Sequence, residues 1–201
     1  GSNISTASGQ VMISGPVTLT HDVVWNTAAS GPGGNLSLLN TIDATSGQNL
    51  TLTSGAGDIS VTGKVGATGP LGDVLITSAR NTTFSDSLSA KSYQQLSGAK
   101  TTFLGNVVTT GAVPSSGTDG FQFTGNELHF AGASSLDSTG HDVTITADLL
   151  DLPTTFLNAT GKTVTIQTLT ASRGIGLNDA SQPLNIIAPE LAAVHAANLV
   201  V

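Results

Sequence analysis

The sequence predicts an all-β fold, a parallel β-solenoid of roughly nine coils, from three observations. One sequence pattern recurs along the chain and can be aligned on the apolar residues Val61, Phe84 and Phe103. Short strands of strictly alternating polarity recur between these positions, and turn residues such as Gly, Asn and Asp separate the segments. A unit of about 22 residues cannot bury its own apolar face, so copies of it must stack on one another.

The aligned apolar position, here called the anchor, can be followed from the start of the chain to its middle. The anchors are Ile13, Leu38, Val61, Phe84, Phe103 and Phe130. They recur at intervals of about 19 to 27 residues, a period typical of solenoid repeats. We therefore expect parallel strands about 4.8 Å apart, stacked into a rod of roughly 40 Å.

A second recurrent strand lies between the anchors. It occurs at residues 50–53, 74–77, 121–124, 143–146, 164–167 and 184–187. Strict alternation over four residues places one set of side chains inside the solenoid. The predicted inward residues are Leu50, Leu52, Val74, Ile76, Val143, Ile145, Val164, Ile166, Leu184 and Ile186.

Two regions depart from this repeat. Residues 109–120 contain Gly, Ser, Thr and Pro and are long enough to leave the stack as a loop, where function often concentrates. Residues 189–197 have a Pro near a helix start and an Ala-rich body. This segment predicts either a short helical turn packed on the last coil or another irregular coil.

Composition excludes several classes of function. Charged residues make up 9% of the chain, against roughly a quarter in ordinary globular domains, and the net charge is −7 with no basic cluster. Nucleic acid is therefore an improbable partner. The absence of cysteine removes disulfides and cysteine-ligated metals, and no apolar run approaches a membrane span, so we expect no membrane insertion.

Asp22, Asp58, Asp73 and Asp142 each stand just before a strand. We expect each carboxylate to accept hydrogen bonds from backbone amides of its turn. The alternative is a polysaccharide lyase or hydrolase, which needs clustered carboxylates, and Asp58 and Asp73 are the best candidates for such a cluster. No basic residue occupies the corresponding position, so the sequence favours the structural role.

The four histidines, His21, His129, His141 and His195, include two His-Asp neighbours. Neighbours in a strand point to opposite faces, so we expect turn or surface roles for all four. No nucleophile elbow and no calcium-binding nonapeptide occurs. The sequence therefore assigns no catalytic, cofactor-binding or metal-binding residue.

Outward threonines offer a further alternative. Thr51, Thr53, Thr144, Thr146 and Thr165 fall beside the inward pairs, and a flat threonine array can bind ice. Leu75, Gln122 and Ile187 interrupt that column, and the coils differ in length. Because outward β-branched residues also simply favour the strand, ice binding is the weakest of the three readings.

The repeats resemble those of large bacterial exoproteins, and the nearest group is the filamentous-haemagglutinin-like adhesins. The resemblance rests on the alternation over residues 49–61, the two Thr-Thr-Phe segments ending at Phe84 and Phe103, and residues 172–177 followed by 189–193. It covers roughly residues 10–200 and is one of repeat style. It implies a right-handed parallel β-helix that is exported to the cell surface as an adhesive shaft, and it brings no site residues.

We therefore expect residues 1–201 to form one solenoid segment of a secreted bacterial cell-surface protein. The expected role is non-enzymatic: a stiff shaft that presents loops and Thr/Asn-rich faces to host or surface glycans or proteins. Residues 197–201 have the pattern of a strand, so the terminal coils would expose unpaired backbone groups. The segment would then be either a slice of a longer shaft or a subunit that self-associates through its open ends.

Overall fold

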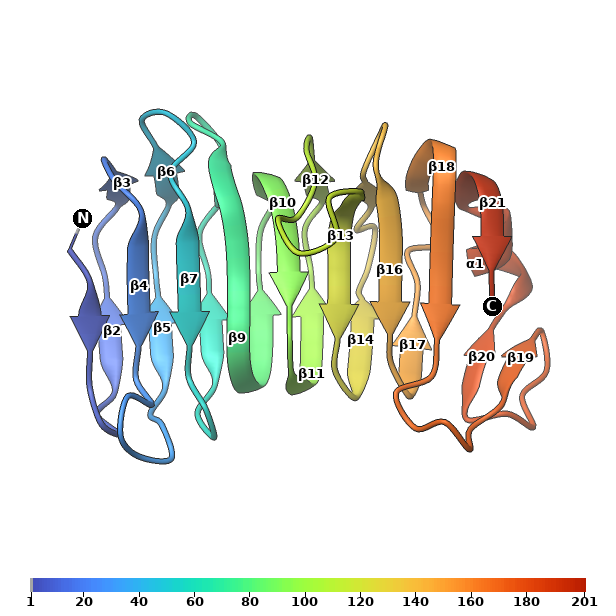
Figure 1. Cartoon of the computed structure of the whole chain (residues 1–201), viewed down its shortest axis with the longest axis horizontal. Coiled ribbons are helices and arrows are strands. Elements are labelled where there is room, and N and C mark those ends of the chain that lie inside the picture. The colour runs from blue at the N-terminus through green and yellow to red at the C-terminus, as the bar shows by residue number, and fades with distance from the viewer. Residues whose placement is uncertain (1) are drawn as a thin grey trace.

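Three faces make up each coil of the protein. The structure is a computed structural model that describes residues 2–201 as a parallel β-solenoid of about 7 turns, with one short helix near the C-terminus. The strands of successive coils run side by side along the long axis, with β1 and β21 at opposite ends (Figure 1). The predicted fold class is confirmed.

Face 1 carries the alternating strands predicted between the anchors. It consists of β1 (Ile4–Ser5), β4 (Val23–Asn26), β7 (Leu50–Thr53), the first part of β9 (Leu71–Phe84), the last part of β10 (Leu88–Gln95), β13 (Asp119–Thr124), β16 (Asp142–Thr146) and the last parts of β18 (Leu157–Gln167) and β21 (Val194–Val200). All these pairings are parallel. The predicted inward residues of this face are buried, because alternation along a strand turns every second side chain to the core.

Face 2 carries the anchors. It consists of β2 (Val11–Ile13), β5 (Leu36–Leu38), β8 (Ile59–Val61), the last part of β9, β11 (Gly98–Phe103), β14 (Glu127–Phe130) and β17 (Leu149–Asp151). The six anchors pair with one another in register from Ile13 through Phe130. The predicted anchor column is therefore confirmed.

Face 3 closes each coil with shorter strands. It consists of β3 (Val17–Leu19), β6 (Ile42–Ala44), β12 (Val107–Thr109), β15 (Leu136–Asp137) and the first parts of β10, β18 and β21, with Val65 bridging between β6 and β10. Its inward column is Val17, Ile42, Val65, Leu88, Val107, Leu136, Leu157 and Val194. This column was not predicted, because two- and three-residue strands carry too little alternation to stand out.

The prediction of nine coils was wrong, since the protein has about 7 turns. The prediction applied one repeat of about 22 residues to the whole chain, whereas the coils differ in length. The last one is the longest: from Leu157 to Val194 it includes β19 (Ile175–Leu177), β20 (Leu184–Ile186) and α1 (Ala188–Ala192). Eight successive pairings join β1 to β21 on face 1, so with strands about 4.8 Å apart this face is roughly 38 Å long.

In the C-terminal coil one detail of the prediction is wrong, and the predicted short helix is confirmed. Leu184 and Ile186 are buried as expected, but β20 pairs with β19 and lies against β17, so it does not continue face 1. Within residues 189–197, the helix α1 ends at Ala192 and is followed by strand β21, which pairs with β18. The side chain of Glu190 is buried and accepts backbone hydrogen bonds from Leu152 and Ile187, which fixes α1 against the preceding coil.

Aromatic rings fill the middle of the core. Phe84, Phe103 and Phe130 stack along face 2, with ring centroids 5.2 Å apart in both steps. On face 1, Tyr93 stacks on Phe121 at 5.0 Å. Parallel, in-register pairing places identical positions above one another, so aromatic residues at one position of the repeat form a continuous stack.

One coil has a polar core that the sequence did not reveal. Gln95 takes an inward position of face 1 between Ile76 and Phe123 and is fully buried. Its side-chain oxygen accepts hydrogen bonds from the hydroxyls of Tyr93 at 2.7 Å and Thr101 at 2.8 Å. These bonds satisfy a buried side-chain oxygen that would otherwise destabilise the fold. Burial also raises the pKa of Tyr93 well above its usual value.

Candidate functional site

The aspartates that precede strands form hydrogen bonds with residues of the next coil. The carboxylate of Asp22 accepts a hydrogen bond from the backbone amide of Asn49 at 2.8 Å, and that of Asp142 accepts one from Thr163 at 2.9 Å. Asn49 continues the series, because its side-chain oxygen accepts the amide of Asp73 at 2.6 Å. The expected amide bonds are present for Asp22, Asp58 and Asp142, but the donors belong to the next coil and not to the residue's own turn. The expectation was wrong for Asp73, whose carboxylate instead contacts the Ser92 hydroxyl and Lys91 Nζ.

Asp58 and Asp73 do not form a cluster. Asp58 precedes β8 on face 2, whereas Asp73 lies in β9 on face 1. Each has a basic partner from the next coil, contrary to expectation: Arg80 Nη2 lies 2.6 Å from Asp58, and Lys91 Nζ lies 3.2 Å from Asp73. The hydrogen bonds from the Arg80 side chain hold the pKa of Asp58 below its usual value.

Ion pairing throughout the described residues joins neighbouring coils. Besides these two pairs, Lys100 pairs with Glu127 and Arg173 pairs with Asp148. A partner in the next coil lies about 4.8 Å away along the axis, which is the natural reach of an outward side chain. The charges of the part of the chain that the structure describes therefore reinforce coil stacking.

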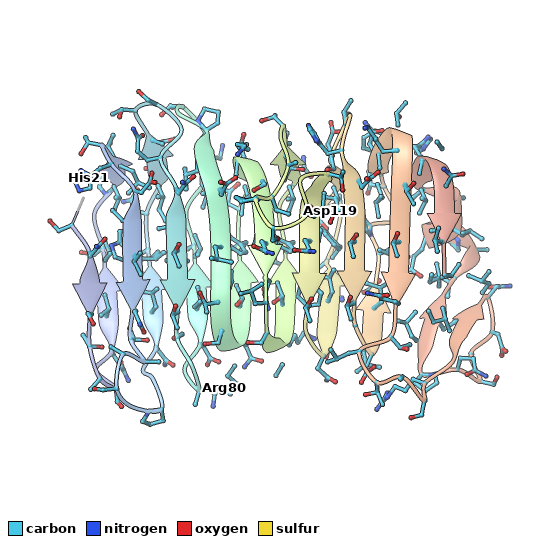
Figure 2. The ribbon with its side chains drawn as sticks, in the orientation of Figure 1. His21, Arg80 and Asp119 are labelled. Carbon is cyan, nitrogen blue, oxygen red and sulfur yellow. The ribbon has the colours of Figure 1, made fainter. Side chains whose placement is uncertain are left out.

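The histidines stay apart from one another. His21 bonds to the neighbouring Thr20 hydroxyl at 3.2 Å and lies on the opposite long edge of the molecule from Arg80 (Figure 2). His195 lies near Phe156, at a ring distance of 5.4 Å. Only His129 approaches a carboxylate within residues 2–201, with Nδ1 2.6 Å from Asp151. The sequence could not reveal this pair, since it depends on the register between β14 and β17.

His129 and Asp151 line a shallow pocket of about 320 Å³ on face 2, here called the histidine pocket. Its wall is completed by residues of β14, β17 and β20, among them Glu127 and Leu149, and by Pro183 just before β20. His129 and Glu127 are each bonded to a partner in a neighbouring coil, Asp151 and Lys100. The titratable side chains of this pocket are therefore already paired with side chains of neighbouring coils.

A larger pocket of about 470 Å³ lies on face 1, beside the predicted loop, and is here called the loop pocket. The chain leaves the stack after Thr109 and returns at β13, and this segment crosses the face near β10 and β13 (Figure 1). Val113 of the loop is fully buried, and Ser115 is bonded to Gln94 at 2.6 Å. The loop is therefore held against the face and forms one wall of the pocket.

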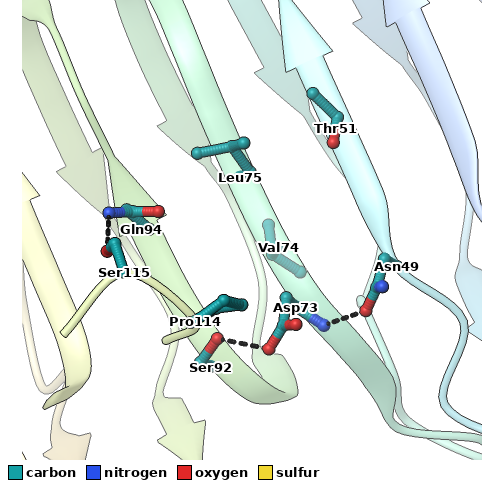
Figure 3. A pocket seen from close by; sticks show the side chains of 9 residues that line it. All are labelled: Asn49, Thr51, Asp73, Val74, Leu75, Ser92, Gln94, Pro114 and Ser115. Atoms are coloured by element: carbon teal, nitrogen blue, oxygen red, sulfur yellow. Dashed lines mark hydrogen bonds between the residues drawn. The ribbon is translucent and has the colours of Figure 1, made fainter. Parts of the chain in front are cut away.

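Polar side chains from three successive coils line the floor of the loop pocket (Figure 3). Asp73 accepts a hydrogen bond from the Ser92 hydroxyl at 2.7 Å and faces Lys91 through the same oxygen, Oδ1. Gln94 donates to Ser115, and Figure 3 shows its carbonyl oxygen turned away from Ser115 and toward Leu75. Thr51 lies on the far side of Leu75.

Three polar atoms of this pocket have no hydrogen-bond partner among residues 2–201: Asp73 Oδ2, Gln94 Oε1 and Thr51 Oγ1. Leu75, Val74 and Pro114 supply apolar surface between them. The pocket therefore offers hydrogen-bond acceptors around an apolar floor, an arrangement typical of small-molecule sites.

Comparison with known proteins finds no match. No family model, no curated protein and no solved structure matches the chain. The fold and the pockets are thus the basis for assigning a function.

No group of three or more His, Asp or Glu side chains within residues 2–201 could hold a metal ion. The described helix is far from the length and hydrophobicity needed to cross a membrane.

The threonine column is short. In the central outward column of face 1, successive coils contribute Val24, Thr51, Leu75, Gln94, Gln122, Thr144, Thr165 and Val200. Only Thr144 and Thr165 are adjacent threonines in it. Leu75 and Gln122 interrupt the column as predicted, whereas Ile187 lies outside this face.

Proposed function

We propose that the chain is a non-enzymatic structural and adhesive shaft segment of a secreted bacterial cell-surface protein. The supporting observation is the continuous parallel stacking of coils from β1 to β21 with one hydrophobic core. Backbone hydrogen bonds and ion pairs between coils run along the long axis, which suits a rod that holds its faces away from the cell. The resemblance to filamentous-haemagglutinin-like repeats agrees with this role.

The shaft would act by presenting its surfaces. Outward Thr, Ser, Asn and Gln side chains and the loop between β12 and β13 are available to host or surface glycans or proteins. We also propose self-association through the ends of the solenoid, because β1 pairs only with β4 and β21 only with β18 within residues 2–201. Sheet edges of this kind readily pair with another chain.

A carbohydrate-active enzyme is the alternative. The geometry gives it less support, since Asp58 and Asp73 lie on different faces and each is paired with a cation of the next coil. A lyase or hydrolase needs two groups that converge on one bond of the substrate.

The experiment that separates the two is a cleavage assay. The chain is incubated with pectate, alginate and neutral polysaccharides, and new reducing ends and unsaturated products are measured. The shaft proposal predicts no product above that of heat-unfolded protein. Turnover that is lost in the Asp58→Asn or Asp73→Asn variant would support the enzyme instead.

A further inference from the structure

The loop pocket has features that a bare shaft does not need. Elsewhere the central column of face 1 is a regular row of outward side chains, but here the loop closes one side of it and creates a volume of about 470 Å³. Small-molecule sites commonly measure roughly 300–1,000 Å³. The loop is also fixed in place, through buried Val113 and the bond of Ser115 to Gln94.

We propose that the loop pocket binds a neutral sugar unit of a polysaccharide. Asp73 Oδ2 and Gln94 Oε1 are free to accept hydrogen bonds, and the Thr51 hydroxyl is free to accept or donate. A pyranose carries several hydroxyl groups that donate at the spacing of neighbouring side chains. Its C–H faces would pack on Leu75 and Pro114.

Charge favours a neutral sugar over an acidic one. Asp73 lies in the wall, and its ion pair with Lys91 leaves no uncompensated positive charge there to bind a carboxylate. Lys91 is held on that side of the pocket by close packing, because a Cβ at Gly111 would lie only 2.5 Å from Lys91 Cγ. An anionic sugar bound there would therefore lose hydration of its carboxylate without gaining a cation partner.

A peptide fits less well. The backbone groups of β7, β9 and β10 are used in the parallel pairing between coils, so an extended peptide cannot add to this face as a strand. The free side-chain atoms are mainly acceptors, whereas a peptide carries as many acceptors as donors. None of the residues that line this pocket is aromatic, so we expect a dissociation constant on the order of 1 mM for a disaccharide.

Sugar binding would give the proposed shaft a ligand. The biological role of this site rests on the proposed function, but the binding itself can be tested without it. The test is NMR titration of the ¹⁵N-labelled chain with cellobiose and lactose as neutral probes and with digalacturonate as the acidic probe. We expect saturable shifts of the Leu75, Gln94 and Ser115 amides with at least one neutral disaccharide, and weaker or no shifts with digalacturonate. A titration without saturable shifts would overturn the sugar site. It would not change the outcome of the polysaccharide cleavage assay, which tests the shaft proposal separately.

Two outward threonines of one column provide matched variants. Thr51→Trp fills the loop pocket and should abolish the shifts, whereas Thr165→Trp, at the equivalent position three coils from the loop, should retain them. Thr51→Val keeps the volume but removes the free hydroxyl, so it should weaken binding about tenfold and serves if Thr51→Trp does not fold. The proposal is overturned by the absence of saturable shifts with both neutral probes, by tighter binding of digalacturonate, or by equal loss in the two tryptophan variants.

Discussion

Phe103 lies directly on Phe84 of the preceding coil, with ring centroids 5.2 Å apart and ring planes 10° from parallel. The two residues are in register on face 2, and each is almost completely buried. The contact illustrates how the repeat builds the core, because equivalent inward residues of successive coils pack on and bury one another. Stability should therefore depend on which face of a strand a residue occupies more than on its coil.

A carboxylate placed inside the core should be far more damaging than one placed outside. Ile145→Asp buries an unpaired charge at a fully buried position and should lower the free energy of unfolding by about 4 kcal/mol or more. Thr165→Asp, an outward position on the adjacent coil, should cost about 0.5 kcal/mol. Urea denaturation of both variants measures the difference, and equal losses would show that the inward register is wrong.

Thr165 is a better control here than Thr144, although Thr144 is the immediate neighbour of Ile145. The hydroxyl of Thr144 donates to Asp119 at 2.8 Å, so an aspartate in its place would create a carboxylate pair. Thr144→Asp should therefore destabilise more than Thr165→Asp, by about 1 kcal/mol.

The amide bonds between coils should also contribute to stability. Asn49→Ala leaves the backbone amide of Asp73 without its acceptor and removes the bond from Asn49 Nδ2 to Asp22 Oδ2, and should cost about 1–2 kcal/mol. Ser46→Ala, in the exposed turn just before it, should have almost no effect. If chemical denaturation shows both variants to be equally stable, the side-chain bonds between coils have no energetic role.

Acid should weaken the Asp58–Arg80 pair. Because the pKa of Asp58 is lowered in the folded protein, its contribution is present above the unfolded pKa, near 4, and is lost as the pH falls through the folded pKa. Asp58→Asn removes this contribution, so between about pH 5 and about pH 3 the variant should lose less stability than the parent. Arg80→Gln should behave in the same way. Thermal melts across this range test the idea, and parallel pH profiles for parent and variants would refute it.

The sequence was sufficient for the fold class because its signal is local. Alternation at Leu50, Val74 and Ile145 marks the inward side, and the recurrence of anchors from Ile13 to Phe130 gives the register between coils. Gln95 was missed because a buried amide has the polarity of an outward residue, and only its bonds to Tyr93 and Thr101 explain its place. The C-terminal coil was misassigned because β20 has the alternating pattern of face 1 but pairs with β19.

The candidate site could be predicted only in part. The loop at residues 109–120 was recognised as a departure from the repeat, yet nothing in its sequence says that Ser115 meets Gln94, 21 residues earlier. The same holds for His129 and Asp151, whose contact depends on the register of β14 and β17. Side chains that meet between coils of unequal length can be paired only when the three-dimensional stacking is in hand.

Association of the isolated chain should depend on concentration. The edge strand β21 pairs on one side with β18, and an unpaired edge favours pairing with another copy. A charge on the edge should oppose this, so Val200→Lys should weaken association, whereas Thr165→Lys, its stacked neighbour inside the sheet, should leave it unchanged. Sedimentation velocity over a wide concentration range measures both. A strict monomer throughout would exclude end-to-end contact.

The location of the protein tests the shaft proposal most directly. Antibodies raised against the folded chain are applied to intact cells of the organism that produces it, with and without permeabilisation, and bound antibody is measured by immunogold microscopy. A shaft segment of a surface protein predicts dense labelling of intact cells that protease treatment of the surface removes. Labelling that requires permeabilisation would contradict the proposed function.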